Sequence, residues 1–176
     1  VKNVSIIPSN VNLAAAEIEL IGVDKKEYIL KNEIDWIRDQ YDFIIIDCPP
    51  SLGLITTNAL NASDSVLIPV QCEYYALEGL SQLMSSVQAV KRRYNDRLEL
   101  EGVLLTMYDG RLNLTQQVVT EIKKYFPRKV FATVIPRTVR LSEAPSYGQP
   151  ILYYDKSNKG CIAYGALVDE ILKKNR

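Results

Sequence analysis

A short apolar run that ends in an aspartate and two prolines constrains this fold more than any other feature of the sequence. Residues 43–46 are apolar and mostly β-branched, with no polar interruption. Such a run predicts a strand buried on both faces, as at the centre of a parallel sheet. Asp47 follows directly, and Pro49 and Pro50 cannot continue a central strand, so the chain must leave the sheet here. We therefore expect Asp47 at the carboxyl end of a central strand, the edge where open α/β sheets bind ligands.

A carboxylate in that position has two interpretations. Its desolvation is costly without a partner, and a hydrated Mg²⁺ is one natural partner for it. The alternative is that Asp47 only caps the helix that follows. On the apolar run and one aspartate alone, both interpretations stay open.

The rest of the chain alternates predicted strands with predicted helices. Further strands are expected at 4–8, 65–70, 100–107 and 129–135, and helices at 12–20, 25–40, 54–60, 77–94, 113–126 and 162–172. Residues 138–160 are expected to be irregular, and Trp36 to pack on the sheet. The alternation predicts an α/β fold, with a mostly parallel sheet covered by helices on both faces. We expect residues 1–176 to form a single domain.

The composition removes several kinds of site. The sequence contains no histidine, which excludes histidine acid–base catalysis, Ser-His-Asp triads and histidine metal ligands. Its three cysteines are far apart and lack C-x-x-C spacing, so neither a zinc site nor a disulfide framework is supported. No stretch of the sequence approaches the roughly 20 apolar residues of a membrane span.

The charge is unevenly distributed along a neutral chain. Residues 91–140 hold 11 Lys and Arg against 5 Asp and Glu, a local net charge of +6. A locally basic half favours an anionic partner on one side of the protein. The alternative is a set of solvated helix faces, and Lys91, Arg92 and Arg93 would also suit a helix C-terminus.

Four blocks of sequence, in this order, resemble one family. They are 47–53 (Asp-Cys-Pro-Pro-Ser-Leu-Gly), 68–79, 102–109 and 134–145. Over essentially the whole chain they resemble the ParA/MinD group of P-loop ATPases, and within it the Soj-type chromosome partitioning ATPases. The phosphate-loop motif G-x-x-x-x-G-K-[ST] does not occur in the sequence. We therefore expect the C-terminal portion of such an ATPase domain, missing its N-terminal strands and inactive alone.

The resemblance also assigns site residues. It implies a catalytic and Mg²⁺-binding role for Asp47, and a γ-phosphate switch at Pro49, Pro50 and Ser51. The remaining implied contacts are to the nucleotide at Thr106, Met107, Pro136, Arg137 and Thr138, and to DNA at Arg111 and Arg140. For Met107 the alternative is core packing, for Pro136 strand termination, and for the two arginines a solvated surface.

For the complete protein the resemblance implies ATP and Mg²⁺ as cofactors and an ATP-dependent homodimer. It further implies non-specific binding of double-stranded DNA, stimulation by a ParB-type partner, and a cytoplasmic, nucleoid-associated location. A further group of residues would face the second subunit or only cap a helix: Gln71, Glu73, Tyr74, Tyr75, Glu78 and Gly79. The alternatives are a non-hydrolysing nucleotide-sensing regulator and a MinD-like positioning ATPase. Membrane binding is not expected, because the closing helix carries its basic residues only at its very end.

Overall fold

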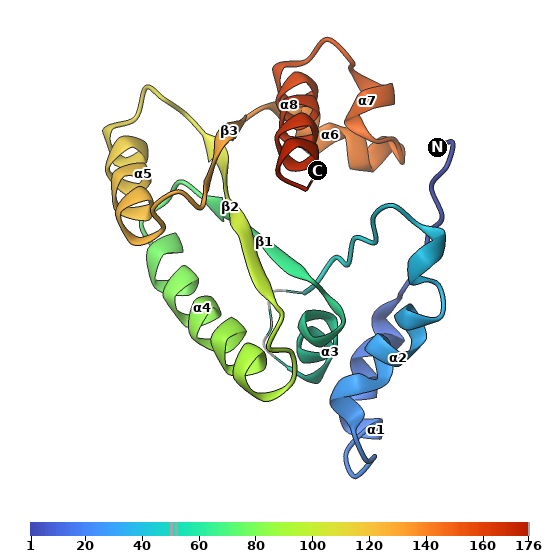
Figure 1. Cartoon of the computed structure of the whole chain (residues 1–176). Helices are drawn as coiled ribbons and strands as arrows, with labels where there is room; N and C mark the ends of the chain where they lie inside the picture. Colours follow the sequence, from blue (N-terminus) through green and yellow to red (C-terminus); the bar gives the residue numbers. More distant parts are fainter. Residues whose placement is uncertain (50, 52, 176) are drawn as a thin grey trace. The chain divides into compact units, whose positions relative to one another are not determined.

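The computed structural model describes residues 1–49, 51 and 53–175 (Figure 1). The chain divides into two compact units. The first contains residues 1–65 and 85–99, and the second contains residues 66–84 and the chain from residue 100 onward. The interpretation of residues 1–176 as one domain stays a prediction.

The second unit is organised around a three-stranded sheet. Its strands are hydrogen-bonded in the order β1 (Ser65–Gln71), β2 (Glu99–Tyr108) and β3 (Val130–Pro136). β2 and β3 run parallel, with Tyr108 opposite Pro136, so their carboxyl ends meet at the same edge. The sequence predicted all three strands to within two residues.

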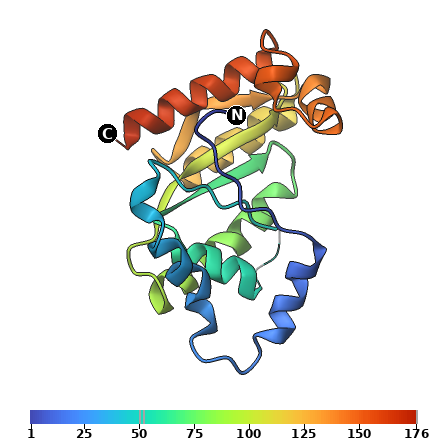
Figure 2. The same cartoon turned by 90° about the vertical axis from the view of Figure 1, so that its right-hand side faces the viewer.

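Helices cover both faces of this sheet (Figures 1 and 2). The first half of α4 (Ala76–Arg93) and all of α5 (Asn113–Tyr125) pack on one face, and α8 (Lys159–Lys174) packs on the other. The predicted α/β class, a mostly parallel sheet between helices, is confirmed. In the described part of the chain, no helix is both long enough and apolar enough to cross a membrane.

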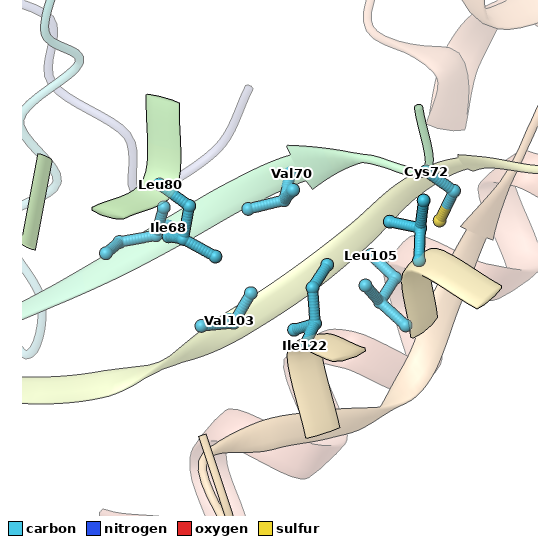
Figure 3. Packing of buried hydrophobic residues seen from close by; sticks show 8 residues of the cluster. Ile68, Val70, Cys72, Leu80, Val103, Leu105 and Ile122 are labelled. Carbon is cyan, nitrogen blue, oxygen red and sulfur yellow. The ribbon is translucent and has the colours of Figure 1, made fainter. Parts of the chain in front are cut away.

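The core of the second unit explains why β2 is apolar at consecutive positions. Val103 and Leu105 point toward α4 and α5 and contact Leu80 and Ile122 (Figure 3). Leu104, between them, points to the opposite face and packs with the cluster that includes α8. Because successive residues of a strand face opposite sides, a strand covered on both faces needs an uninterrupted apolar run.

A register shift interrupts the pairing of β3 with β2. Val103 lies opposite Val130, but Leu105 lies opposite Val134, so β3 carries extra residues between these pairs. Residues in such a bulge lose ladder hydrogen bonds. Glu170 of α8 satisfies two of the amides there, accepting from Ala132 N at 2.8 Å and from Thr133 N at 3.0 Å.

The first unit is helical, and asparagine side chains connect its parts. Its elements are η1 (Val11–Ala15), α1 (Ala16–Glu19), η2 (Lys26–Tyr28), α2 (Ile29–Asp35), η3 (Arg38–Gln40) and α3 (Leu54–Ala62). Asn58 of α3 donates to Lys26 O at 2.9 Å and accepts from Leu30 N at 3.1 Å. Asn95 donates to three carbonyls at the end of α3, where helix carbonyls lack partners within the helix.

Three predictions for the first unit are wrong. Residues 43–46 form no strand and are largely exposed, with Ile45 at 91%. Residues 4–8 also form no strand, and Trp36 is 81% exposed instead of packing on a sheet. The two strand predictions fail for the same reason: a strand needs a hydrogen-bonded neighbour, and neither segment has one among the described residues.

Residues 138–160 were expected to be irregular, and this is also wrong in part. They contain α6 (Val139–Glu143), η4 (Ala144–Tyr147) and α7 (Ile151–Tyr154). These helices are one turn long, too short to produce a detectable periodicity. They are instead defined by end signals, such as the Thr138 side chain, which accepts a hydrogen bond from Leu141 N.

Candidate nucleotide and nucleic-acid site

The carboxyl ends of β2 and β3 place several predicted residues at one edge of the sheet. Thr106 is half-buried, and its carbonyl accepts from Cys72 N of the neighbouring chain segment at 3.3 Å. Met107 is 43% exposed and has a φ of 51°, in the left-handed region that non-glycine residues rarely occupy. Such backbone strain clusters at ligand sites, so Met107 is not a simple core residue.

A pocket of about 430 Å³ opens at this edge. Its lining residues are Tyr108, Asp109, Gly110, Arg111, Pro136, Arg137 and Lys159. The pocket therefore brings Pro136 and Arg137, which were predicted to contact nucleotide, together with Arg111, which was predicted to contact DNA. Thr106 and Met107 do not line it.

The electrostatics of the pocket favour an anionic ligand. Three cationic side chains, Arg111, Arg137 and Lys159, face one carboxylate, Asp109. Arg111 donates to Asp109 through Nε at 2.9 Å and Nη2 at 2.7 Å, and its backbone N–H donates at 3.1 Å. These hydrogen bonds, together with the charge of Lys159, hold the pKa of the Asp109 carboxyl well below its usual range. The Arg111 side chain is still 89% exposed.

Thr138 serves a structural purpose next to the pocket. Its hydroxyl accepts from Leu141 N at 3.2 Å, which caps α6, and donates to Asn158 Oδ1 at 3.2 Å. Asn158 in turn caps α8 by accepting from Gly160 N. A nucleotide contact of Thr138 stays a prediction, since this side chain does not line the pocket.

Arg140 lies on α6, and it is not part of the pocket. Its side chain is 54% exposed and is held by Glu143, Tyr154 and Asp155. The two arginines predicted to contact DNA therefore differ in their surroundings. Arg111 is paired with one carboxylate, and Arg140 with two.

Asp47 and Pro49 belong to the first unit, in an exposed segment that forms neither helix nor strand. The Asp47 carboxylate makes no hydrogen bond or ion pair within the part of the chain that is described. A solvated, uncommitted carboxylate fits Mg²⁺, which is typically bound by one or two carboxylates while keeping several waters. No three acidic or thiol side chains among the described residues gather into a ready-made metal site. Pro50, the second predicted switch proline, lies outside the described residues.

A second pocket, of about 340 Å³, lies along β1 and the start of α4. Gln71, Glu73, Tyr75 and Gly79 line part of it. Glu73 O also accepts from Ala76 N in the first turn of α4. This region therefore does begin a helix, and its role as a subunit contact stays a prediction.

Sequence reasoning missed Lys159, Tyr108 and Asp109 as lining residues. The signal for Asp109 was present, because an acid two residues before Arg111 in a tight turn can pair with it. Lys159 had no such signal. It lies 22 residues after Arg137 and reaches the pocket only because α6 and α7 fold the chain back.

Comparison with known proteins now identifies the family. A family model described as an AAA domain matches residues 1–100. The sporulation initiation inhibitor protein Soj of Bacillus subtilis is 57% identical over 97% of this chain and 68% of that protein. The chain belongs to the ParA/Soj family of P-loop partitioning ATPases. The chromosome partitioning protein ParA of Myxococcus xanthus is 52% identical over 97% of this chain and 60% of its own length.

A solved structure supports the same fold for this ParA/Soj-type chain. Cobyrinic acid a,c-diamide synthase from Mycobacterium smegmatis, with a bound ATP analog and magnesium, superposes with a TM-score of 0.81. It is 34% identical, and the match covers 94% of this chain and 61% of that one. The chain thus spans about two thirds of the length of the relatives that it matches.

Proposed function

We propose that this chain works as part of an ATP- and Mg²⁺-dependent ATPase that partitions DNA. The observation that carries the proposal is its 57% identity to Soj over 97% of its residues. In the proposed cycle the protein dimerises on ATP, binds double-stranded DNA without sequence preference, and is stimulated by a ParB-type partner. The cargo, chromosome or plasmid, is left open.

For the nucleotide we assign residues that border the base and one residue that binds the metal. Pro136 and Arg137 would border the base in their pocket, with Met107 presented by its strained backbone. Asp47 would hold Mg²⁺, which neutralises charge on the transferred phosphate when bound. Because the sequence contains no phosphate-loop motif, we propose that the 176 residues alone do not hydrolyse ATP.

For DNA we assign Arg111 and Arg140. Both guanidinium groups reach solvent from one unit, and phosphate contact requires charge and reach without base recognition. Arg137 and Lys159 add positive charge beside Arg111. This arrangement suits a duplex of any sequence.

This assignment is tested by measuring DNA binding of the complete protein over a series of salt concentrations, with ATP and Mg²⁺ present. Each of R111A and R140A should weaken binding to a duplex of arbitrary sequence. Each lost phosphate contact should also flatten the slope of log affinity against log salt by about 0.9. Unchanged affinity and slope in both variants would overturn the DNA assignment.

A matched control removes an exposed arginine at the other end of β3. Arg128 precedes that strand and has a φ of 64°. Asparagine tolerates this conformation, so R128N deletes the charge without added strain. We expect R128N to keep the wild-type salt slope.

A further inference from the structure

Arg140 is surrounded by hydrogen-bond acceptors of its own chain. Its Nη1 donates to Glu143 Oε2 at 3.0 Å and to Tyr154 OH at 3.5 Å, and its Nε lies 3.6 Å from Asp155 Oδ2. The guanidinium carbon also lies 5.9 Å from the centre of the Tyr154 ring. Among the described residues, only Nη2 of this guanidinium has no partner.

The charge of Arg140 is therefore more than balanced locally. One guanidinium faces two carboxylates, a net charge of −1, whereas Arg111 faces Asp109 alone and has two further cations nearby. A DNA phosphate approaching Arg140 meets both carboxylates as well. The phosphate must therefore compete with these carboxylates for the guanidinium.

We propose that Glu143 and Asp155 compete with DNA phosphate for Arg140, and so limit how tightly the protein holds DNA. The inference rests on the proposed DNA contact of Arg140. When DNA binds, Arg140 then breaks its ion pairs with the carboxylates and pairs with the phosphate. The two acids set the free-energy cost of this change of partner. They are positioning residues that act through Arg140 and do not themselves touch DNA.

The exchange is feasible because the ion pairs are partly exposed to solvent. Glu143 and Asp155 are 38% and 27% exposed at the side chain, and such pairs contribute little net stability. When Arg140 leaves the carboxylates, its contacts with the Tyr154 hydroxyl and ring would still orient it. The Tyr154 ring also stacks on Tyr147 at 5.1 Å, a contact that involves neither acid.

The test neutralises each acid without changing its shape. E143Q and D155N are measured for binding of a non-specific duplex across a salt series, with ATP and Mg²⁺, in the protein as its gene encodes it. Each variant should bind about two- to fivefold tighter than wild type, the gain expected from removing one competing exposed ion pair to Arg140. D169N removes an exposed acid on a different helix, α8, and it should change affinity by far less.

Two further variants separate this inference from the proposed function. R140A should weaken DNA binding, and R140A/E143Q should match R140A, because the gain from E143Q requires Arg140. If R140A binds DNA like wild type, the DNA assignment of Arg140 fails, and this inference with it. If R140A weakens binding but neither E143Q nor D155N tightens it beyond D169N, only this inference fails. D155N leaves the hydrogen bond from Tyr154 to Glu143 in place. It therefore tests the inference even if E143Q disturbs the structure of α6.

Discussion

Two short apolar runs of this chain, residues 43–46 and 103–105, have similar composition and opposite environments. Val103 and Leu105 are 0% and 1% exposed, whereas Phe43 and Ile45 are 52% and 91% exposed. Residues 103–105 lie in β2, between β1 and β3, with helices on both faces. Residues 43–46 belong to no strand.

The difference shows that an apolar run favours a buried strand, but that the strand forms only where other strands can pair with it and helices can cover it. Both runs contain residues that are enriched in strands, Phe43 and three isoleucines in one and Val103 in the other. Only β2 has hydrogen-bonded strands on each side, and burial of unpaired backbone polar groups would be costly.

The largest expected effect comes from truncating the buried run. L105A should lower the free energy of unfolding by about 2–5 kcal/mol, because it leaves a cavity against Ile122 and its neighbours. Chemical denaturation followed by circular dichroism measures this loss.

The matched control makes a similar truncation in the exposed run. I45A should cost under about 0.5 kcal/mol, since the Ile45 side chain is almost fully solvated. A cost for I45A close to that of L105A would contradict the comparison, because it would mean that residues 43–46 are buried.

A smaller effect is expected where β2 approaches β3 most closely. A Cβ on Gly102 would lie 2.6 Å from Phe131 Cε2 and 2.9 Å from Lys129 O. G102A should therefore destabilise the protein by about 1–3 kcal/mol through overpacking, measured as a shift in the denaturation midpoint. G165A on α8 meets nothing within 4 Å, and it should instead be neutral or stabilising. Equal effects of the two substitutions would argue against close packing at β2.

The smallest effect concerns the bulge in β3 and depends on pH. Partial burial opposes ionisation of Glu170, but the Ala132 and Thr133 amides outweigh it, so its pKa lies below the usual value. A lowered folded pKa means that the stabilisation is complete above the unfolded value of about 4.3, and is lost as pH falls through the folded pKa.

E170Q tests this contribution. It should cost about 1 kcal/mol at neutral pH, because a charged acceptor is replaced by a neutral one. It should also remove part of the acid destabilisation seen in wild type, measured by thermal melts across pH 3–7. An E170Q melting profile parallel to that of wild type, with D169N as control, would contradict the assignment.

Much of the fold was predictable because its signals are local. The 3.6-residue periodicity of 77–94 and 113–126 predicted α4 and α5, and the apolar runs predicted all three strands. The prediction failed where a signal required distant residues. The run at 43–46 has the composition of a central strand, but its local sequence does not indicate whether other strands lie beside it to form hydrogen bonds.

For the site, sequence alone determined which residues follow the strands. Arg111 comes shortly after β2 and Arg137 directly after β3, and parallel strands bring such residues to one edge. The family resemblance added chemical roles for these positions, and the 57% identity to Soj established the family. Those conclusions need only residue order.

Only the tertiary structure decided which charges meet. It placed Lys159 beside Arg111 and Arg137, and it set Glu143, Tyr154 and Asp155 around Arg140. The physical reason is that ion pairs depend on distances of a few ångströms between side chains. Those distances are created by three one-turn helical segments whose short sequences carry no periodic signal of their own.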